Sequence, residues 1–332
     1  MKRILTFALV ICFLLSGCAK TDSKVTKTVL AMDTVMTLTV YGGTQQQLDE
    51  AEQLIKELDD LLSATKDTSE TSLINASNGA AISVSDRTMQ LIRCSVELGS
   101  STNGALDISL TPVIRAWGFL GGDYRIPDDA ELQNLLEKVD YSKIETGDGT
   151  VTLPEGMEIS FGAVAKGYTG DLLMELFKNQ GIESAIVTLG GNVQALGLKP
   201  DGSKWNVAVQ NPFGDGSLGM LQVDGKAVVT SGGYERYFEQ DGETYWHIID
   251  PSTGKPAKSG LVSVTIVCDS GVTADGLSTA LFVMGLDGAI EYWKTNGGFD
   301  AVLVDENGGV YVTEGIADDF EPESGYMQII IN

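Results

Sequence analysis

The chain has 332 residues, of which 43% are hydrophobic and 20% are charged, and its formal net charge is −24. These proportions are ordinary for a globular protein, and the length allows one large domain or two lobes. Lysine and arginine form no cluster, which argues against a nucleic-acid-binding protein because phosphate backbones need concentrated positive charge. An acidic surface favours solubility and makes a counter-cation useful wherever a phosphate is bound.

The N-terminus has the pattern of a secretion signal. Lys2 and Arg3 precede an apolar run over residues 4–15, which is too short to span a bilayer. The sequence Leu-Ser-Gly-Cys that ends at Cys18 resembles the lipobox of bacterial lipoproteins. It predicts a signal peptide over 1–17 and a lipid on Cys18; the alternative is an ordinary cleaved signal in which this cysteine has no role.

Residues 18–28 are polar beyond the cysteine and are expected to form a tether, so the folded domain is expected over 29–332. Two cysteines of that domain, Cys94 and Cys268, lie in apolar segments. They could pair in an oxidising compartment or remain buried thiols, and nothing indicates a cysteine metal site.

The first half of the domain mixes strands and helices. Its predicted elements are a strand over 29–41, a helix over 48–62, a polar loop over 63–78, helices over 88–99, 112–119 and 128–138, paired strands over 151–153 and 158–161, and a helix that opens at 162–167 and ends near 179.

The second half predicts mainly antiparallel strands. Its elements are strands over 184–189, 193–198, 205–210 and 218–223, a hairpin within 228–256, a strand over 261–268, helices over 273–284 and 288–296, a hairpin of 301–305 with 309–313, and a last strand over 327–331. Strands and helices do not alternate regularly, which predicts an α+β fold with mixed, largely antiparallel sheets rather than a doubly wound one.

The only histidine, His247, lies on the second arm of the predicted 228–256 hairpin. Asp241-Gly242 is a strong turn signal, and the arm ends at Asp250-Pro251 because proline cannot donate to a ladder. A lone imidazole near an aspartate and a glycine-rich bend suits proton transfer or a position facing a phosphate. The alternative is a half-buried histidine whose hydrogen bonds are made by the backbone.

Two helix starts offer further candidate sites. Asp275 and Thr279 are four residues apart on one helical face, and their oxygens suit Mg²⁺ on a phosphate, although helix capping would also favour such residues. Residues 162–167 combine small residues with Lys166 at a helix N-terminus, which suits a phosphate, or else a tightly packed helix start. The paired glycines of 190–191 and 232–233 fit either a site or ordinary turns.

Seven motifs occur in an order that is recognisable. They are Met32-Asp33-Thr34, Gly104-Ala105-Leu106-Asp107, Gly162 to Gly167 with Lys166, Gly190-Gly191-Asn192, Ser231 to Tyr237, His247-Ile248-Ile249-Asp250-Pro251 with Thr253-Gly254, and Ala274-Asp275 to Thr279. From about residue 29 to about 296, the chain closely resembles the FAD:protein FMN transferases, the ApbE-like flavin transferases.

The resemblance implies a T-fold-like α+β architecture that binds FAD and Mg²⁺. It implies transfer of FMN from FAD to a serine or threonine hydroxyl of a target protein, with release of AMP. The implied targets are subunits of membrane redox complexes and extracytoplasmic electron-transfer proteins. Many members are lipoproteins on the outer side of the cytoplasmic membrane, which agrees with Cys18.

Site residues follow from the matching motifs. The residues implied to contact FAD are Met32, Ala105, Leu106, Asp107, Ser160, Lys166 and His247. The metal would be held by the backbone carbonyl of Ala163 and the side chains of Asp275 and Thr279. His247 and Asp275 are the implied catalytic residues, with His247 as the base or orienting group and Asp250 as a less favoured substitute.

The chain departs from the family pattern at two positions. Thr65 stands where many members have a tyrosine, and it cannot stack on a ring; Ser160 stands where many have an aspartate, and it adds no charge. The rival functions are a lipid-anchored FAD-binding protein without transferase activity, an enzyme that hydrolyses FAD to FMN and AMP, and an extracytoplasmic solute-binding lipoprotein.

Overall fold

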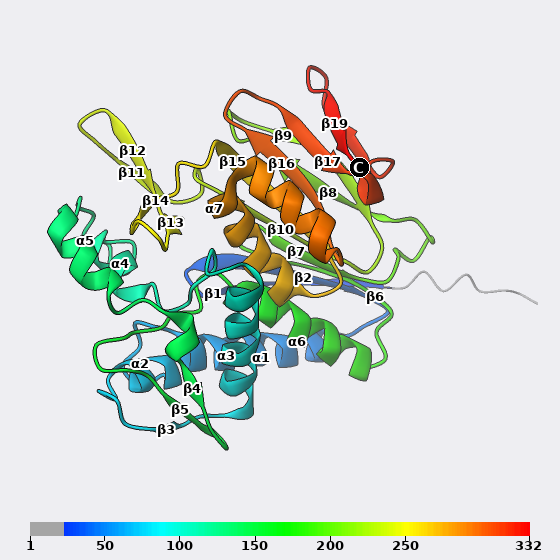
Figure 1. Cartoon of the computed structure of the whole chain (residues 1–332). Helices are drawn as coiled ribbons and strands as arrows, with labels where there is room; N and C mark the ends of the chain where they lie inside the picture. The colour runs from blue at the N-terminus through cyan, green and yellow to red at the C-terminus, as the bar shows by residue number, and fades with distance from the viewer. Residues whose placement is uncertain (1–22) are drawn as a thin grey trace, which may run out of the picture.

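The computed structural model of the chain describes residues 23–332 (Figure 1). The predicted signal peptide 1–17 and the lipidated Cys18 lie outside the described residues. No helix in the described part of the chain is both long and apolar enough to cross a bilayer.

A nine-stranded sheet organises the molecule, in the order β1-β2-β6-β7-β10-β15-β16-β17-β19. Neighbouring strands run antiparallel except for β17 and β19, which run parallel. The strands are β1 (Lys24–Ala31), β2 (Thr34–Tyr41), β6 (Ser184–Leu189), β7 (Asn192–Leu196), β10 (Ala227–Gly232), β15 (Leu261–Cys268), β16 (Asp300–Asp305), β17 (Val310–Thr313) and β19 (Gln328–Ile331).

A three-stranded sheet covers one face of the large sheet. It consists of β8 (Trp205–Gln210), β9 (Ser217–Val223) and β18 (Phe320–Pro322) in the order β18-β9-β8. Every second residue of β8 is buried, and these residues pack with valines of β10, β15 and β16. This alternation is the pattern of a sheet that is buried on one side only.

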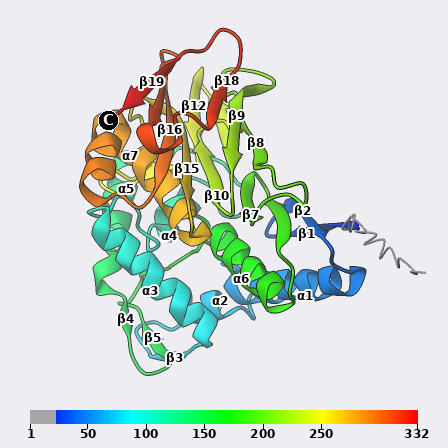
Figure 2. The same ribbon diagram turned by 90° about the vertical axis from the view of Figure 1, so that its right-hand side faces the viewer.

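Three helices cover the other face of the large sheet: α1 (Gln45–Leu62), α6 (Ala165–Asn179) and α7 (Gly271–Asn296). Figures 1 and 2 show α6 and α7 side by side over the centre of the large sheet. Met36 and Leu38 of β2 pack into the core formed with α1 and α6, whereas Val264 and Ile266 of β15 pack with α7. The N-termini of α6 and α7 and the C-terminal end of α1 lie at the same edge of the sheet, where the cavity described below lies.

The remaining elements lie outside these layers. They are α2 (Glu70–Asn75), β3 (Ile82–Ser83), α3 (Asp86–Ser101), α4 (Thr111–Ala116), α5 (Asp129–Leu136), η1 (Tyr141–Lys143), β4 (Glu145–Thr146), β5 (Thr150–Thr152), β11 (Tyr237–Gln240), β12 (Glu243–Trp246), β13 (Ile249–Asp250), β14 (Lys255–Pro256) and η2 (Glu314–Ile316). Figure 1 shows α4, α5 and the β11–β14 strands grouped on one side, joined through an aromatic and aliphatic cluster.

The single strand predicted over 29–41 is wrong, because the chain reverses within it. Ala31 pairs with Thr34, and the two residues between them, Met32 and Asp33, have φ of 50° and 57°. Positive φ at both central residues is typical of a tight hairpin turn that usually contains Asn-Gly or Asp-Gly. Met-Asp gave no such signal in the sequence.

The tether predicted over 18–28 is also wrong in its last five residues, since β1 begins at Lys24. Residues 24–28 pair with 37–41 of β2. Lys27 forms ion pairs with Asp49 and Glu52 of α1. The folded domain therefore begins before residue 29.

Two further differences concern short elements. The strands predicted over 151–153 and 158–161 do not pair with each other: β5 pairs with β3 and β4, and Glu158 bridges to Leu110. The predicted loop over 63–78 contains α2, which begins with Ser69 as its N-cap. By contrast, the division of 273–296 into two helices is confirmed by the non-helical backbone of Gly285 inside α7.

Candidate functional site

A cavity of about 460 Å³ lies where the N-termini of α6 and α7 meet the β1–β2 turn and the segment between β10 and β14. Its size is in the range of small-molecule binding sites. Each residue that the sequence assigned to FAD or metal contacts it, namely Met32, Ala105, Leu106, Asp107, Ser160, Ala163, Lys166, His247, Asp275 and Thr279. Asp250, the substitute base considered from the sequence, does not line it, and its carboxylate binds the backbone N–H and hydroxyl of Ser252.

The N-termini of α6 and α7 are in direct backbone contact because both have glycine at the crossing. A Cβ added to Gly167 would lie 2.0 Å from the carbonyl oxygen of Gly271, and one added to Gly271 would lie 2.4 Å from that of Gly167. The absence of side chains at these two positions lets the helices approach closely. It brings Lys166 of α6 and Asp275 of α7 to the same wall of the cavity.

Carboxylates cap the two helices reciprocally. Asp275 of α7 accepts a hydrogen bond from the backbone N–H of Gly167 at 2.8 Å. Asp171 of α6 accepts hydrogen bonds from the backbone N–H groups of Gly271 and Val272 at 2.6 and 3.0 Å. Each carboxylate thus lies at the positive N-terminal end of the other helix.

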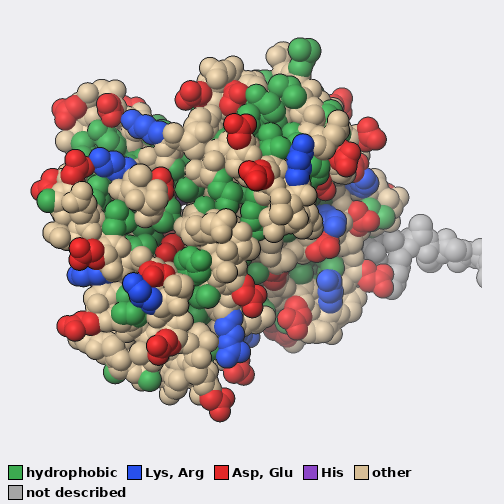
Figure 3. All heavy atoms as spheres, in the orientation of Figure 1, with side chains coloured by type: hydrophobic (Ala, Val, Ile, Leu, Met, Phe, Trp, Pro, Cys, Tyr) green, Lys and Arg blue, Asp and Glu red, His purple; other side chains and the backbone are tan. Residues whose placement is uncertain are grey.

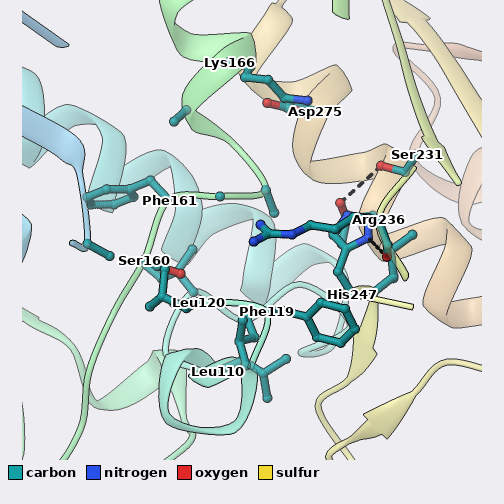
Figure 4. Close-up of a pocket in the computed structure, with 18 of the residues that line it drawn as sticks. Leu110, Phe119, Leu120, Ser160, Phe161, Lys166, Ser231, Arg236, His247 and Asp275 are labelled. Atoms are coloured by element: carbon teal, nitrogen blue, oxygen red, sulfur yellow. Dashed lines mark hydrogen bonds between the residues drawn. The ribbon is translucent and has the colours of Figure 1, made fainter. Parts of the chain in front are cut away.

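The polar end of the cavity combines charges of both signs (Figure 4). Asp275 is 4% exposed, and burial raises the pKa of its carboxyl, which the charge of Lys166 opposes. No cationic group among residues 23–332 lies within 4.0 Å of the Asp275 carboxylate. A buried carboxylate without an ion pair is costly, so this position favours a bound cation.

The oxygens around Asp275 fit Mg²⁺. Ala163 and Thr279 line the same cavity, and the Thr279 hydroxyl lies 3.4 Å from that of Ser231. One carboxylate, one hydroxyl and one carbonyl are hard oxygen donors, and Mg²⁺ typically takes one or two carboxylates together with substrate phosphates. Within the described residues there is no cluster of three His, Cys, Asp or Glu side chains, so a metal here relies on such mixed donors.

His247 follows the last residue of β12, and its backbone fixes the ring. Its N–H donates to the carbonyl of Arg236 at 3.0 Å, and Nδ1 lies 3.1 Å from the same oxygen. Because a carbonyl only accepts, Nδ1 carries the proton and Nε2 has a free lone pair. The ring packs edge-on against Phe119, with centroids 6.3 Å apart.

The surroundings of His247 keep its imidazole neutral. Burial lowers the pKa of His247 to about 4, and the charges of Arg236 and Lys166 act in the same direction. Nearby cations disfavour a second positive charge, whereas an anion bound in the cavity would raise this pKa again.

Two charged residues of the cavity wall, Glu235 and Arg236, were not predicted from the sequence. The Glu235 side chain lines the cavity and remains partly open to solvent; desolvation raises its pKa to about 7, and the charge of Lys166 opposes this shift. Both residues belong to the 231–237 motif, one of those on which the family resemblance rests. The motif does not show that their side chains line the cavity. Figure 4 shows Arg236 extending across the middle of the cavity.

Two of the predicted contact residues also have structural roles. The Asp107 carboxylate accepts hydrogen bonds from the N–H and hydroxyl of Ser109 and from the N–H of Tyr141, which holds its own loop in place. The N–H of Met32 donates to Asp59 at 3.1 Å, and Asp59 pairs with Lys66. These contacts tie the β1–β2 turn to the loop that contains Thr65.

The two positions that depart from the family pattern also lie at the cavity. Thr65 lines it from the α1–α2 loop, and its hydroxyl lies 3.1 Å from that of Ser63. Ser160 lines it beside Phe161, and its backbone N–H donates to Ile108 at 3.0 Å. The site therefore has a hydroxyl at each of these positions, without a stacking ring or an added charge.

The family model described as "ApbE family" matches residues 32–303. The chain belongs to the ApbE family. The FAD:protein FMN transferase of Klebsiella pneumoniae (strain 342) is 32% identical over 307 residues, which are 90% of this chain and 95% of that protein.

Solved ApbE structures agree with the fold. The crystal structure of the ApbE protein of Thermotoga maritima has a TM-score of 0.84 and 30% identity, and covers 90% of this chain and 99% of that one. The apo flavinyl transferase ApbE of Pseudomonas stutzeri has a TM-score of 0.82 and 29% identity, covering 90% and 97%. The α+β fold expected from the sequence is confirmed.

Proposed function

We propose that the chain is a Mg²⁺-dependent FAD:protein FMN transferase that acts on a serine or threonine hydroxyl of a target redox protein. The observation that carries this proposal is that Lys166, His247 and Asp275, from three distant segments, line one cavity. Family membership and the FAD:protein FMN transferase relative support it.

The reaction exchanges a phosphoanhydride bond for a phosphoester bond. The acceptor oxygen forms a bond to the phosphorus of the FMN half while the bond between the two phosphates of FAD breaks, and AMP leaves with the bonding electron pair. Such transfers depend mainly on positioning and on neutralising charge in the transition state.

The proton of the acceptor hydroxyl passes to Nε2 of His247, since Nδ1 is already engaged with the Arg236 carbonyl. The low pKa of the ring makes it a weak base. The negative diphosphate of bound FAD raises that pKa and brings the ring closer to the strength that the transfer needs.

Lys166 and the N-terminus of α6 supply positive potential to the diphosphate. Ala163, Asp275 and Thr279 are the residues that would hold Mg²⁺, whose bound charge would neutralise phosphate oxygens. The reciprocal capping by Asp171 and Asp275 keeps both helix ends in register with that site.

The proposal is tested with the full chain, FAD, Mg²⁺ and a candidate redox subunit, by in-gel flavin fluorescence and by the mass added to the subunit. His247→Ala should lower transfer by about 10²- to 10⁴-fold and leave FAD affinity nearly unchanged. Asp275→Ala should abolish the metal-dependent transfer.

Equal losses of FAD affinity and transfer in His247→Ala would assign a structural role to the ring. Normal transfer by Asp275→Ala without Mg²⁺ would refute the metal assignment. Release of FMN and AMP without labelling of any subunit would instead identify an FAD hydrolase, and FAD binding without either product would identify a carrier.

We also propose that Cys18 carries a lipid and holds the enzyme on the extracytoplasmic face of the cell membrane. The support is the lipobox pattern and the preceding apolar run. Cys18→Ser should move the protein from the membrane fraction to the soluble fraction; an unchanged distribution would contradict the anchor.

A further inference from the structure

We propose that Arg236 binds the diphosphate of the substrate through its guanidinium group, as a second cation opposite Lys166. This inference rests on the proposed use of FAD. The observation behind it is that Arg236 reaches into the cavity from the segment that fixes the ring of His247.

The backbone of Arg236 is held in place independently of its side chain. Its carbonyl accepts both the N–H and the Nδ1–H of His247, at 3.0 and 3.1 Å. The preceding residue is held in a turn by the hydrogen bond from Glu235 N–H to the Gly232 carbonyl at 3.2 Å. The guanidinium therefore extends from the same fixed point as the imidazole, and both groups face one bound molecule.

The guanidinium is not engaged by a protein carboxylate. Arg87, Arg115 and Arg125 each pair with a glutamate at the surface. Among residues 23–332, neither Arg236 nor Lys166 has a carboxylate oxygen within 4.0 Å. In a chain with a net charge of −24, two cations left without a partner in one cavity indicate an anionic ligand.

The position of Arg236 suits a diphosphate. Figure 4 shows Lys166 and Asp275 at one end of the cavity, Leu110 and Phe119 at the other, and the guanidinium between them. A planar guanidinium makes two parallel hydrogen bonds to phosphate oxygens, which an ammonium group does not. Arg236 would thus bind the phosphates from the side opposite the helix N-termini.

The test compares ligand pairs that differ only in phosphate: FMN with riboflavin, and ADP with adenosine. Affinities are measured with Mg²⁺ for the wild type, Arg236→Gln and Arg236→Lys. Arg236→Gln should weaken FMN or ADP binding by about 10- to 100-fold, since hydrogen bonds to charged groups are the stronger ones. Riboflavin and adenosine affinities should not change, and Arg236→Lys should fall between wild type and Arg236→Gln.

Equal losses for ligands with and without phosphate would overturn the proposal and would indicate that Arg236 stacks on a ring or only shapes the cavity. Unchanged binding of all four ligands would overturn it as well. Arg93→Gln is the matched control, because Arg93 is an exposed arginine of α3 that does not line the cavity. Wild-type protein that neither binds FAD nor labels a target would refute the proposed function itself, which separates the two failures.

Discussion

His247 and Glu235 line the same cavity, and their surroundings shift their two pKa values in opposite directions. Burial lowers that of His247 to about 4 and raises that of Glu235 to about 7. Desolvation, which disfavours any charged form, is the largest cause of both shifts, and the charges of Arg236 and Lys166 lower the pKa of His247 further. Near neutral pH the site therefore contains a neutral imidazole and a carboxyl that is only partly ionised.

The raised pKa of Glu235 predicts a pH-dependent stability. The folded protein binds the Glu235 proton more tightly than the unfolded chain does, so this group stabilises the fold below about pH 4.5, and that contribution is lost as the pH rises to about 7. Glu235→Gln should therefore have a higher melting temperature than the wild type at pH 8, with a difference that shrinks at pH 4.5. Thermal unfolding without ligand measures this; a difference independent of pH would show that the shift is absent.

Individual site residues were predictable to different degrees. Lys166, His247 and Asp275 carry groups whose chemistry is evident from residue type and motif, and the cavity brings them together. Arg236 was not predicted as a site residue, because the sequence of a loop does not indicate which of its side chains point into a cavity. The engagement of Asp107 by Ser109 and Tyr141 depends on contacts between distant segments, which no local pattern encodes.

At the scale of elements, the contact of α6 with α7 decides the geometry of the polar end of the cavity. The sequence showed a helix start at each of the two places, with small residues at 162–167 and residues suited to helix capping at 273–279. It did not show that Gly167 and Gly271 touch, or that Asp171 and Asp275 each cap the opposite helix. These features arise only when two helices far apart in the sequence meet.

Gly167→Ala should disturb this contact. The added methyl group would overlap the backbone of Gly271, and overpacking of this kind typically costs about 1–3 kcal/mol of unfolding free energy. Transfer activity should fall as well, because α7 carries Asp275. Chemical denaturation and a transfer assay measure both effects.

Gly162→Ala is the matched control for stability, since its Cβ meets nothing within 4 Å. If both variants unfold at the same denaturant concentration, the close approach of α6 and α7 is not a constraint on the fold.

Secondary structure was predicted well where periodicity is strong, as in α1, α3, α7 and the strands from 184 to 268. It failed where the chain reverses without a turn signal. Met32 and Asp33 adopt left-handed backbone conformations, which cost a non-glycine residue roughly 1–2 kcal/mol. Their surroundings impose this conformation, including the hydrogen bond from Met32 to Asp59, and a local pattern cannot report it.

At the scale of the whole molecule, acidic side chains are spread over the surface. Figure 3 shows Asp and Glu distributed across the visible face, with Lys and Arg scattered among them. Lys166 and Arg236, for which residues 23–332 offer no carboxylate oxygen within 4.0 Å, instead line the cavity, together with the carboxyl groups of Asp107, Glu235 and Asp275. An anion is therefore attracted only at short range, within the cavity itself.

The first strand makes the position of the N-terminus important for the whole domain. A chain that starts at Ser23 keeps all of β1, whereas one that starts at Val29, the boundary suggested by the sequence, loses five ladder residues and the ion pairs of Lys27. The shorter chain should unfold at a lower temperature and should aggregate more readily, because the edge of β2 is then uncovered. Equal melting temperatures and solubility for the two chains would mean that residues 24–28 add nothing to the fold.

The length of β1 also separates the start of the folded domain from the cavity. The strand runs from Lys24 to Ala31 and delivers the chain to Met32 at the lip of the cavity, so its two ends are roughly 23 Å apart at about 3.3 Å per residue. If the enzyme is anchored through Cys18 as proposed, a strand directed away from the bilayer would hold the opening of the cavity clear of the lipid headgroups. Such an anchor would favour acceptor hydroxyls on protruding loops or water-exposed domains of a neighbouring protein over hydroxyls at the lipid surface.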